Sequence, residues 1–328
     1  MQFDIKAHTI LEVVHGSHAY GLNSPESDID IRGIAVPPEE YFFSCDAVFE
    51  QYEGPSPNKI VNGQAPIEDN DTVIYDIRKF CKLALDGNPN IIEILWIPER
   101  CVKIMTDEAK EIIAHRDLFL SKKVRHTFSG YAHAQLKRIK GHRRWLLDPP
   151  KVKPTRVAYG LPEENTVSPA MKGLLRVMEA AEGEGGITEN IVSPFVLETL
   201  KKERAYHSTL LEWTNYEKWQ RERNPKRAAL EAKFGYDTKH AMHLVRLMTM
   251  CREILTTGAV IVERPDREFL LSIRGGAWPY EKLLEWAEAQ DAELETIYQN
   301  CNILPYTADR KAVGELCMKI VKKRLGIR

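Results

Sequence analysis

The sequence predicts an α+β protein, with an N-terminal domain of strands and helices over residues 1–115 and a mainly helical domain over residues 116–328. The first observation is the length of 328 residues, which favours about two domains. The second is that short β-branched or apolar runs alternate with helical spacing in the first hundred residues. The third is that beyond about residue 105 the apolar spacing becomes predominantly helical.

The N-terminal elements are predicted from short runs bounded by Gly, Pro and Asp. Strands are expected where apolar, alternating or β-branched runs occur, at residues 10–14, 28–36, 47–52 and 72–75. A helix is expected over residues 77–85, because its apolar residues recur at helical spacing. Residues 58–69 are expected to form a loop, and another buried element begins at residue 91.

The rest of the chain is predicted to be helical, with Pro- and Gly-rich loops between the helices. Helices are expected over residues 118–147, 169–181, 194–219, 228–233, 237–256, 280–299 and 308–325. Asp237 or Thr238 is the expected N-cap of the helix over 237–256, because a short polar side chain there accepts from free backbone N–H groups. Loops are expected at residues 151–154 and 182–186.

The composition favours a cytoplasmic protein. No run of about 18 apolar residues is present, which excludes a transmembrane helix. The opening MQFDIKAHTILEVV lacks the basic and then apolar layout of a signal peptide. Six cysteines are scattered without a CxxC pair, which argues against a zinc site, a disulfide framework or a disulfide-linked partner, and for a reducing compartment.

The net charge of −1 conceals a strong internal asymmetry. Residues 1–100 hold 17 Asp and Glu against 7 Lys and Arg, whereas residues 121–156 hold 11 Lys and Arg against one acid. An acidic domain is therefore followed by a short basic segment, which indicates a polyanionic partner.

The segment HGSHAYGLNSPESDIDIRGI over residues 15–34 carries the chemistry. Small residues Gly16 and Ser17 follow a strand, where backbone N–H groups and a hydroxyl can face an anion. Asp28 and Asp30 are two residues apart on a predicted strand, so their carboxylates face one side while Ile29 is expected to pack into the core. Paired carboxylates repel each other unless a cation lies between them, and Mg²⁺ prefers carboxylates shared with substrate phosphates.

This pattern resembles the DNA polymerase β-like nucleotidyltransferase superfamily, whose signature is an apolar residue, Gly, Gly or Ser, a spacer and Asp-apolar-Asp or Glu. Three blocks are similar to its RNA-repair-associated, RlaP-like branch: GSHAYGLNSPESDIDIRG, YDIRKFCKLALDGNPNIIEILW and GYDTKHAMHLVRL. The resemblance covers roughly residues 10–100 and 235–275, and implies a mixed sheet with helices in the first domain.

The resemblance also implies a third carboxylate on a nearby strand. Asp76, at the end of the strand over residues 72–75, is the candidate. Asp76 could equally be the N-cap of the following helix, and Asp71 or Glu68 could supply the group instead.

Further candidates for nucleotide binding lie on the helix over 237–256. Lys239, His243 and Arg246 are spaced by four and three residues, so they share one helix face that could neutralise a triphosphate. The same face could be an exposed basic stripe, or His243 could be buried and hydrogen-bonded. Arg32 could pair with a carboxylate or with a phosphate.

The basic segment over residues 121–156 is a candidate RNA-binding surface, because basic residues interleave with aromatic ones there. Its basic candidates are Lys137, Arg138, Lys140, Arg143 and Arg144. A solvated helix face is the alternative interpretation. The aromatic stretch over residues 206–219 is expected to serve helix packing rather than base stacking.

These features predict a nucleotidyltransferase that uses two Mg²⁺ ions, or Mn²⁺, held by Asp28, Asp30 and Asp76, with an NTP such as ATP as substrate. Gly16 and Ser17 would hold the β- and γ-phosphates. The expected acceptor is an RNA hydroxyl, on a tRNA or an RNA 3′ end, and pyrophosphate is released. The alternatives are a small-molecule or protein acceptor, or a non-catalytic RNA-binding module.

Overall fold

The computed structural model describes residues 3–54, 71–164, 173 and 194–327. The loop expected at 58–69, the helix expected at 169–181 and the loop expected at 182–186 lie wholly or almost wholly outside these residues. The chain packs as two compact units, one of residues 1–139 with 236–328 and the other of residues 140–235. This packing groups the chain differently from the expected boundary at residue 115, and the functional division at that boundary stays a prediction.

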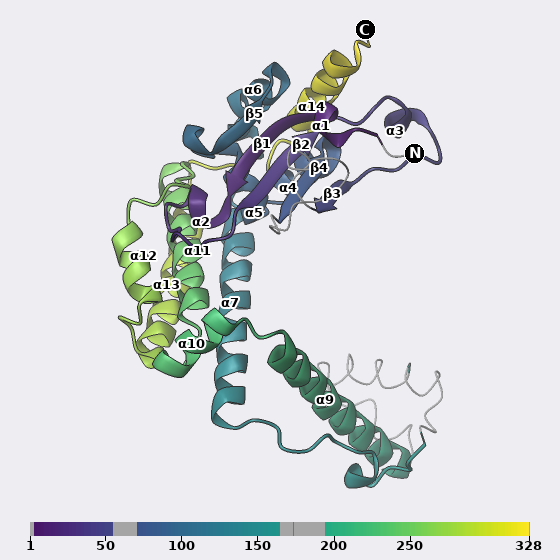
Figure 1. The fold of residues 1–328 in the computed structure, drawn as a ribbon, viewed down its shortest axis with the longest axis vertical. Helices are drawn as coiled ribbons and strands as arrows, with labels where there is room; N and C mark the ends of the chain where they lie inside the picture. The colour runs from purple at the N-terminus through teal and green to yellow at the C-terminus, as the bar shows by residue number, and fades with distance from the viewer. Residues whose placement is uncertain (1–2, 55–70, 165–172, 174–193, 328) are drawn as a thin grey trace. The chain divides into compact units, whose positions relative to one another are not determined.

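A five-stranded mixed sheet forms the N-terminal part of the first unit, as predicted (Figure 1). The strands are β1 (Thr9–His15), β2 (Asp30–Ala35), β3 (Gln51–Gly54), β4 (Thr72–Asp76) and β5 (Val102–Met105). Their order across the sheet is β3-β4-β2-β1-β5. β2 and β4 run parallel, and the other three neighbouring pairs are antiparallel. Two central strands, β1 and β2, therefore carry the segment that the sequence singles out.

The strand predictions need correction at three places. The strand expected over residues 47–52 is β3, which spans only Gln51–Gly54. β2 begins at Asp30 rather than at residue 28, because the pairing with β1 starts opposite His15. Ile29 precedes the ladder and is 38% exposed, so it does not pack into the core as expected. β5 was not expected at all, because its four residues lie between a 3-10 helix and an α-helix and show no clear alternation.

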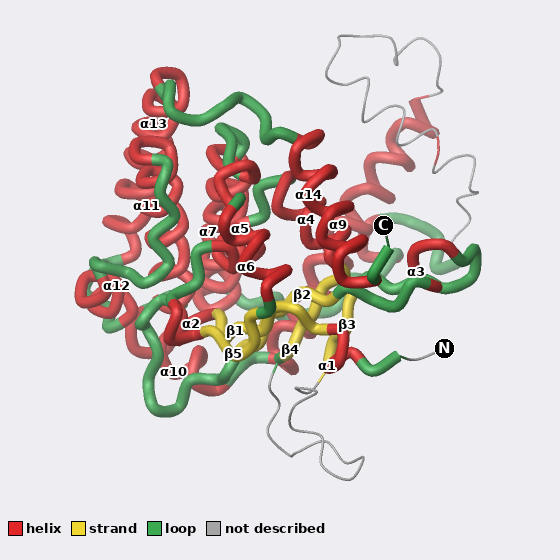
Figure 2. Tube along the Cα trace, turned by 90° about the horizontal axis from the view of Figure 1, so that it is seen from above, coloured by secondary structure: helices red, strands yellow, loops and turns green. Residues whose placement is uncertain are grey.

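Short helices flank the sheet. They are α1 (Ile5–His8), α2 (Gly16–Ala19), α3 (Glu40–Phe43), α4 (Ile77–Leu85), α5 (Pro89–Leu95), α6 (Asp107–Ala114) and α14 (Arg310–Leu325), with 3-10 turns at Glu99–Cys101 and Arg116–Phe119. α4 has the predicted bounds and buries Ile77, Phe80 and Ala84. Helices α4, α6 and α14 lie on one side of the sheet (Figure 2), so a C-terminal helix completes the packing of the N-terminal domain.

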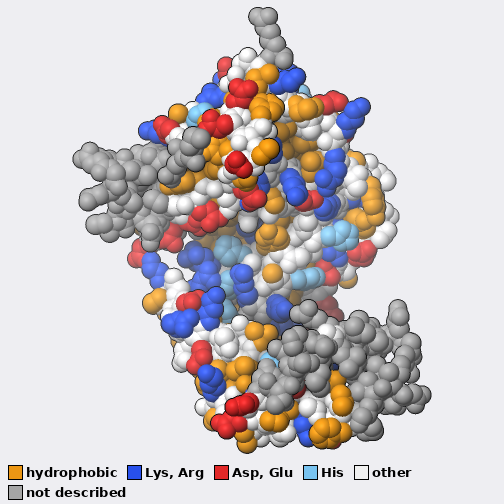
Figure 3. All heavy atoms as spheres, turned by 90° about the vertical axis from the view of Figure 1, so that its right-hand side faces the viewer, with side chains coloured by type: hydrophobic (Ala, Val, Ile, Leu, Met, Phe, Trp, Pro, Cys, Tyr) orange, Lys and Arg blue, Asp and Glu red, His pale blue; other side chains and the backbone are white. Residues whose placement is uncertain are grey.

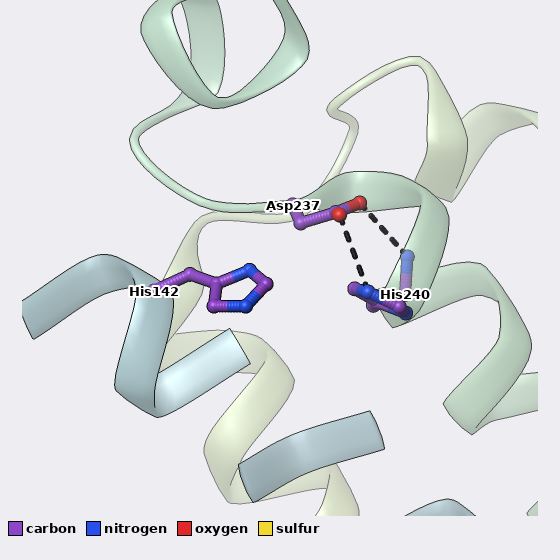
Figure 4. Close-up of side chains that lie close together, drawn as sticks. All are labelled: His142, Asp237 and His240. Carbon is purple, nitrogen blue, oxygen red and sulfur yellow. Dashed lines mark hydrogen bonds and ion pairs between the residues drawn. The ribbon is translucent and has the colours of Figure 1, made fainter. Parts of the chain in front are cut away.

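The remaining helices of the first unit form a bundle around α11. α11 (Thr238–Thr257) packs against α12 (Arg267–Arg274) and α13 (Tyr280–Asn300), and α7 (Val124–Leu147) enters the core through its first half. Asp237 is the N-cap of α11 and accepts from the backbone N–H of His240 at 3.0 Å (Figure 4). The His240 ring nitrogen Nε2 also lies 3.5 Å from Asp237 Oδ2. The predicted capping of this helix is confirmed.

The second unit consists of the end of α7, a 3-10 turn at Val157–Tyr159, α9 (Pro194–Glu222) and α10 (Pro225–Phe234). Rings of Trp145, Tyr216 and Trp219 pack together, with the two tryptophan centroids 5.4 Å apart. This contact agrees with the expectation that the aromatic stretch serves helix packing. Among the described residues, no helix is long and apolar enough to cross a membrane. All six cysteines are free thiols.

Candidate active site

Gly16 and Asp30 meet where β1 ends. His15, the last residue of β1, lies opposite Asp30 in the antiparallel ladder, and the chain then turns at Gly16 with φ +64°. A β-carbon built on Gly16 would stand 2.2 Å from Asp30 Oδ2. Only glycine both tolerates this left-handed conformation and leaves room for the carboxylate. The structure therefore brings together the two halves of the motif that the sequence spacing had linked.

Ser17 lies in α2, a four-residue helix that directly follows Gly16. The backbone N–H of Tyr20 donates to Gly16 O at 3.2 Å, and that of Leu22 donates to Ser17 O at 2.8 Å. These bonds fold residues 16–22 into a tight turn beside the Asp30 carboxylate. A turn of this kind presents backbone N–H groups that suit an anion.

Asp30 is the first residue of β2, and Asp28 lies two residues before the strand, so the two are not side by side on one strand as expected. Asp28 is exposed, and the Asp30 side chain keeps 33% of its surface accessible. Arg32 Nη2 lies 3.7 Å from Asp30 Oδ1 and 3.5 Å from Asp71 Oδ2. The Arg32 guanidinium therefore lies between the carboxylates of Asp30, in β2, and Asp71, just before β4, so Arg32 pairs with carboxylates, one of the two options that the sequence left open.

Asp76 is not brought to this place. β2 and β4 are parallel, with Ile31 opposite Thr72 and Ala35 opposite Asp76, so Asp76 lies about 16 Å along the sheet from Asp30. Its buried carboxylate caps α4 through Arg78 N at 2.7 Å and pairs with the Arg78 guanidinium. The expectation of Asp76 beside Asp28 and Asp30 is corrected, because its alternative role as a cap accounts for its position.

Asp71, one of the alternatives for the third carboxylate, lies close to Asp30. It immediately precedes β4, and its carbonyl accepts from Ile31 N at 3.0 Å. Its side chain is 70% exposed and shares Arg32 with Asp30. Glu68, the other alternative, lies outside the described residues.

The α11 candidates have different surroundings. Arg246 is 4% exposed, and its Nη1 lies 2.5 Å from Glu93 Oε1. Its guanidinium also lies over the Tyr20 ring at 3.8 Å. Arg246 is therefore part of a buried ion pair rather than open to a phosphate. Lys239 and His243 lie on the same face of α11, and both are half-buried.

Sequence reasoning missed a set of residues that hold the turn over residues 16–21. Arg100 Nη1 donates to His18 O at 3.0 Å, and Arg267 Nε donates to Gly21 O at 2.5 Å. Arg264 N donates to Tyr20 O at 3.1 Å. No spacing rule links these arginines to a motif 79 or more positions earlier, but a charged Glu93 within the apolar run IIEILW was a signal of a buried ion pair.

The five basic RNA-binding candidates all lie on α7. Lys137, Arg138 and Lys140 are exposed, and Arg143 is half-buried. Arg144 is exposed and pairs with Glu212 at 2.5 Å. On the face shown in Figure 3, Lys and Arg side chains are interspersed with acidic and apolar ones. The five basic candidates follow one another along a single helix, so this basic charge is concentrated on α7.

The carboxylates of Asp30 and Asp71 are of the kind that binds a divalent cation. Asp30 and Asp71 share one positive group, so the pair already lies where a cation is stabilised. Within the described part of the chain, the acidic groups at this edge do not form a closed set of three ligands around one point. Mg²⁺ does not need such a cage, because it usually takes one or two carboxylates and completes its shell with water and substrate phosphates.

Comparison with known proteins agrees with this geometry. The family model described as RlaP, the RNA repair pathway DNA polymerase beta family, matches residues 2–161. A protein of Enterobacteria phage T4, described as an uncharacterized 38.9 kDa protein of the nrdC-mobD intergenic region, is 26% identical over 300 residues. That alignment covers 85% of this chain and 86% of the phage protein. No solved structure matches the chain. Residues 2–161, which hold the Gly16-Ser17 turn and both Asp28 and Asp30, are thus the part of the chain that matches the RNA repair pathway DNA polymerase beta family.

Proposed function

We propose that this protein is a metal-dependent nucleotidyltransferase that transfers NMP from an NTP to a hydroxyl of RNA, on a tRNA or an RNA 3′ end. One observation carries the proposal: the Gly16 turn and the Asp30 carboxylate lie in van der Waals contact. An anion-binding turn and a cation-binding carboxylate at one point suit a triphosphate that arrives with its divalent ion. The family description, which names RNA repair, supports the same chemistry.

In this proposal, the backbone N–H groups at Gly16 and Ser17 and the Ser17 hydroxyl hold the β- and γ-phosphates. Asp28, Asp30 and Asp71 lie at or just before the beginnings of β2 and β4, where they would hold Mg²⁺. Bound there, divalent ions would polarise the acceptor hydroxyl and balance the triphosphate charge. Lys239 and His243 on α11 are the remaining positive candidates for the triphosphate, while Arg246 acts through its ion pair.

The transfer conserves atoms and charge. The acceptor oxygen forms a bond to the α-phosphorus, and the bond from that phosphorus to the bridging oxygen of the β-phosphate breaks, so pyrophosphate leaves. The acceptor proton passes to an accessible carboxylate at this edge, and Asp71, which is 70% exposed and adjacent to Asp30, is placed to accept it.

RNA is the favoured acceptor because of the charge on α7. Lys137, Arg138 and Lys140 are exposed there, and a polyanion gains affinity when such side chains displace its counterions. Arg143 and Arg144 continue this basic stretch toward the end of the helix. If the protein bound no RNA at low salt, RNA would be excluded as the acceptor.

The experiment is to incubate the full chain with each α-labelled NTP, Mg²⁺ and total RNA, and to ask which molecule becomes labelled. Asp28→Ala and Asp30→Ala should lose at least 10³-fold in transfer, and a chelator should abolish transfer by the wild type. Label on a small molecule or on the protein itself would move the acceptor out of RNA. Undiminished transfer by Asp30→Ala with its fold intact would end the proposal.

A further inference from the structure

Glu93 is a buried carboxylate that contacts residues on both sides of the Gly16–Ala19 turn. It lies in α5, whose neighbours Ile91, Ile92, Ile94 and Leu95 are all buried, and the Glu93 side chain itself is fully buried. A carboxylate is stable in such surroundings only when it is paired and hydrogen-bonded. Its partners therefore show which parts of the chain it holds.

Three side chains converge on Glu93. Arg246 Nη1 donates to Oε1 at 2.5 Å, and the Tyr20 hydroxyl donates to Oε2. His15 Nε2 lies 3.3 Å from the same Oε2. Burial raises the pKa of Glu93, but the Arg246 charge and the bonds from His15 and Tyr20 outweigh burial and bring its pKa to about 2. The carboxylate is therefore ionised, and its charge is balanced by α11.

His15 and Tyr20 lie on either side of α2, so this network connects Glu93 to both ends of that helix. His15 is the last residue before α2, and Tyr20 is the first residue after it. Both ends of the Gly16–Ala19 turn are thus attached to one carboxylate, which belongs to a different helix. The Arg246 guanidinium lies over the face of the Tyr20 ring, 3.8 Å from its centroid, and this cation–π contact also helps to hold the ring.

We propose that Glu93 is a positioning residue, which holds the Gly16-Ser17 turn in the conformation that binds the triphosphate. This inference rests on the proposed function, since it assigns a role within the same site. Because the Glu93 side chain is fully buried and contacts His15 and Tyr20, it acts through these two residues rather than by touching the nucleotide. The turn must be held from outside, because Gly16 adopts a left-handed conformation and α2 has only four residues.

The decisive variant is Glu93→Gln, which keeps the size and one acceptor oxygen but removes the charge. Glu203→Gln is the matched control, since Glu203 is also buried and also binds an arginine, Arg156 at 3.0 Å, and a histidine, His207 at 3.6 Å. Two quantities are measured in both variants: amide hydrogen exchange over residues 15–22 without ligand, and the Kd of a non-hydrolysable NTP with Mg²⁺.

We expect Glu93→Gln to exchange at least 10-fold faster over residues 15–22 and to bind the NTP at least 10-fold more weakly. Glu203→Gln should change neither quantity by more than twofold. If Glu93→Gln fails to fold, Tyr20→Phe removes one hydrogen bond but keeps the buried Glu93–Arg246 ion pair, and should weaken NTP binding about threefold with the same local increase in exchange.

The inference is overturned if Glu93→Gln, or Tyr20→Phe in its place, binds the NTP as the wild type does, or if the control weakens binding equally. Failure of the proposed function is seen separately, in the wild type: it would bind no NTP and transfer no label with any of the four nucleotides.

Discussion

Gly16 and Asp30 are in such close contact that a single added carbon on residue 16 would overlap the carboxylate, at 2.2 Å from Oδ2. The contact joins the end of β1 to the beginning of β2, where His15 and Asp30 are ladder partners. The Gly-Ser and Asp-x-Asp signatures begin twelve positions apart in the sequence, and this contact brings them together in one site.

Gly16→Ala should abolish nucleotide transfer and destabilise the protein by about 1–3 kcal/mol, because the new methyl group displaces Asp30 and strains a left-handed backbone. Gly258→Ala is the control. It has a similar φ of +71° at the end of α11, but its nearest neighbour would be Ile303 Cδ1 at 3.8 Å. Transfer assays with thermal unfolding separate the two effects. A fully active Gly16→Ala would show that the contact is unimportant.

Asp71→Ala should mainly reduce transfer activity, whereas Asp76→Ala should mainly reduce stability. Asp71 is exposed beside Asp30, so its loss should reduce transfer at least 10²-fold and leave stability nearly unchanged. Asp76 caps α4 and pairs with Arg78, so its loss should cost about 1–3 kcal/mol in the free energy of unfolding and spare the activity of the folded fraction. Denaturant unfolding and transfer rates measure both quantities, and the reverse result would restore Asp76 as the third carboxylate.

The stabilisation from Glu93 should depend on pH. Its pKa is lowered from 4.5 to about 2 in the folded state, so the pairing contributes fully above about pH 4.5 and is lost as the pH falls through about 2. The difference in unfolding free energy between the wild type and Glu93→Gln should therefore shrink by roughly 3 kcal/mol across this window. Urea unfolding at several pH values measures it, and a difference that stays constant would contradict the ionised pair.

Removal of charge from α7 should weaken RNA binding without affecting the nucleotide site. The triple variant Lys137→Ala, Arg138→Ala and Lys140→Ala should lower the slope of log K against log salt by about 2, since each phosphate contact contributes about 0.7–0.9. The control is a variant with Lys110, Lys311 and Lys319 changed to Ala, because these residues are exposed on α6 and α14. Equal slopes in both variants would assign the effect to net charge alone.

The fold was predictable where an element carries its own pattern. α4 has the predicted bounds, and the predicted Asp237 cap begins α11, because apolar spacing and capping are local properties. The start of β2 was placed two residues early, because the partner strand and not the alternation decides where a ladder begins. β5 was missed because it depends on β1 for its pairing and has only four residues.

The site was predictable only as far as it is contiguous in sequence. Gly16, Ser17, Asp28 and Asp30 come from one segment, whereas the choice between Asp71 and Asp76 depends on the parallel register of β2 and β4. That register is a tertiary property. Arg246 was predicted to face a triphosphate, whereas its guanidinium is buried and pairs with Glu93. Sequence patterns locate a charged residue but do not identify its ion-pair partner when that partner is distant in the sequence.

The Glu93–Arg246 pair also constrains how the protein is made. The two residues are 153 positions apart, so a ribosome adding about 5–20 residues per second synthesises Arg246 roughly 8–30 s after Glu93. During that interval α5 carries a carboxylate without its cationic partner, and the Gly16 turn lacks its support from Arg267. The turn that we propose binds the nucleotide should therefore reach its final conformation only after α11 and α12, which carry Arg246 and Arg267, have been synthesised.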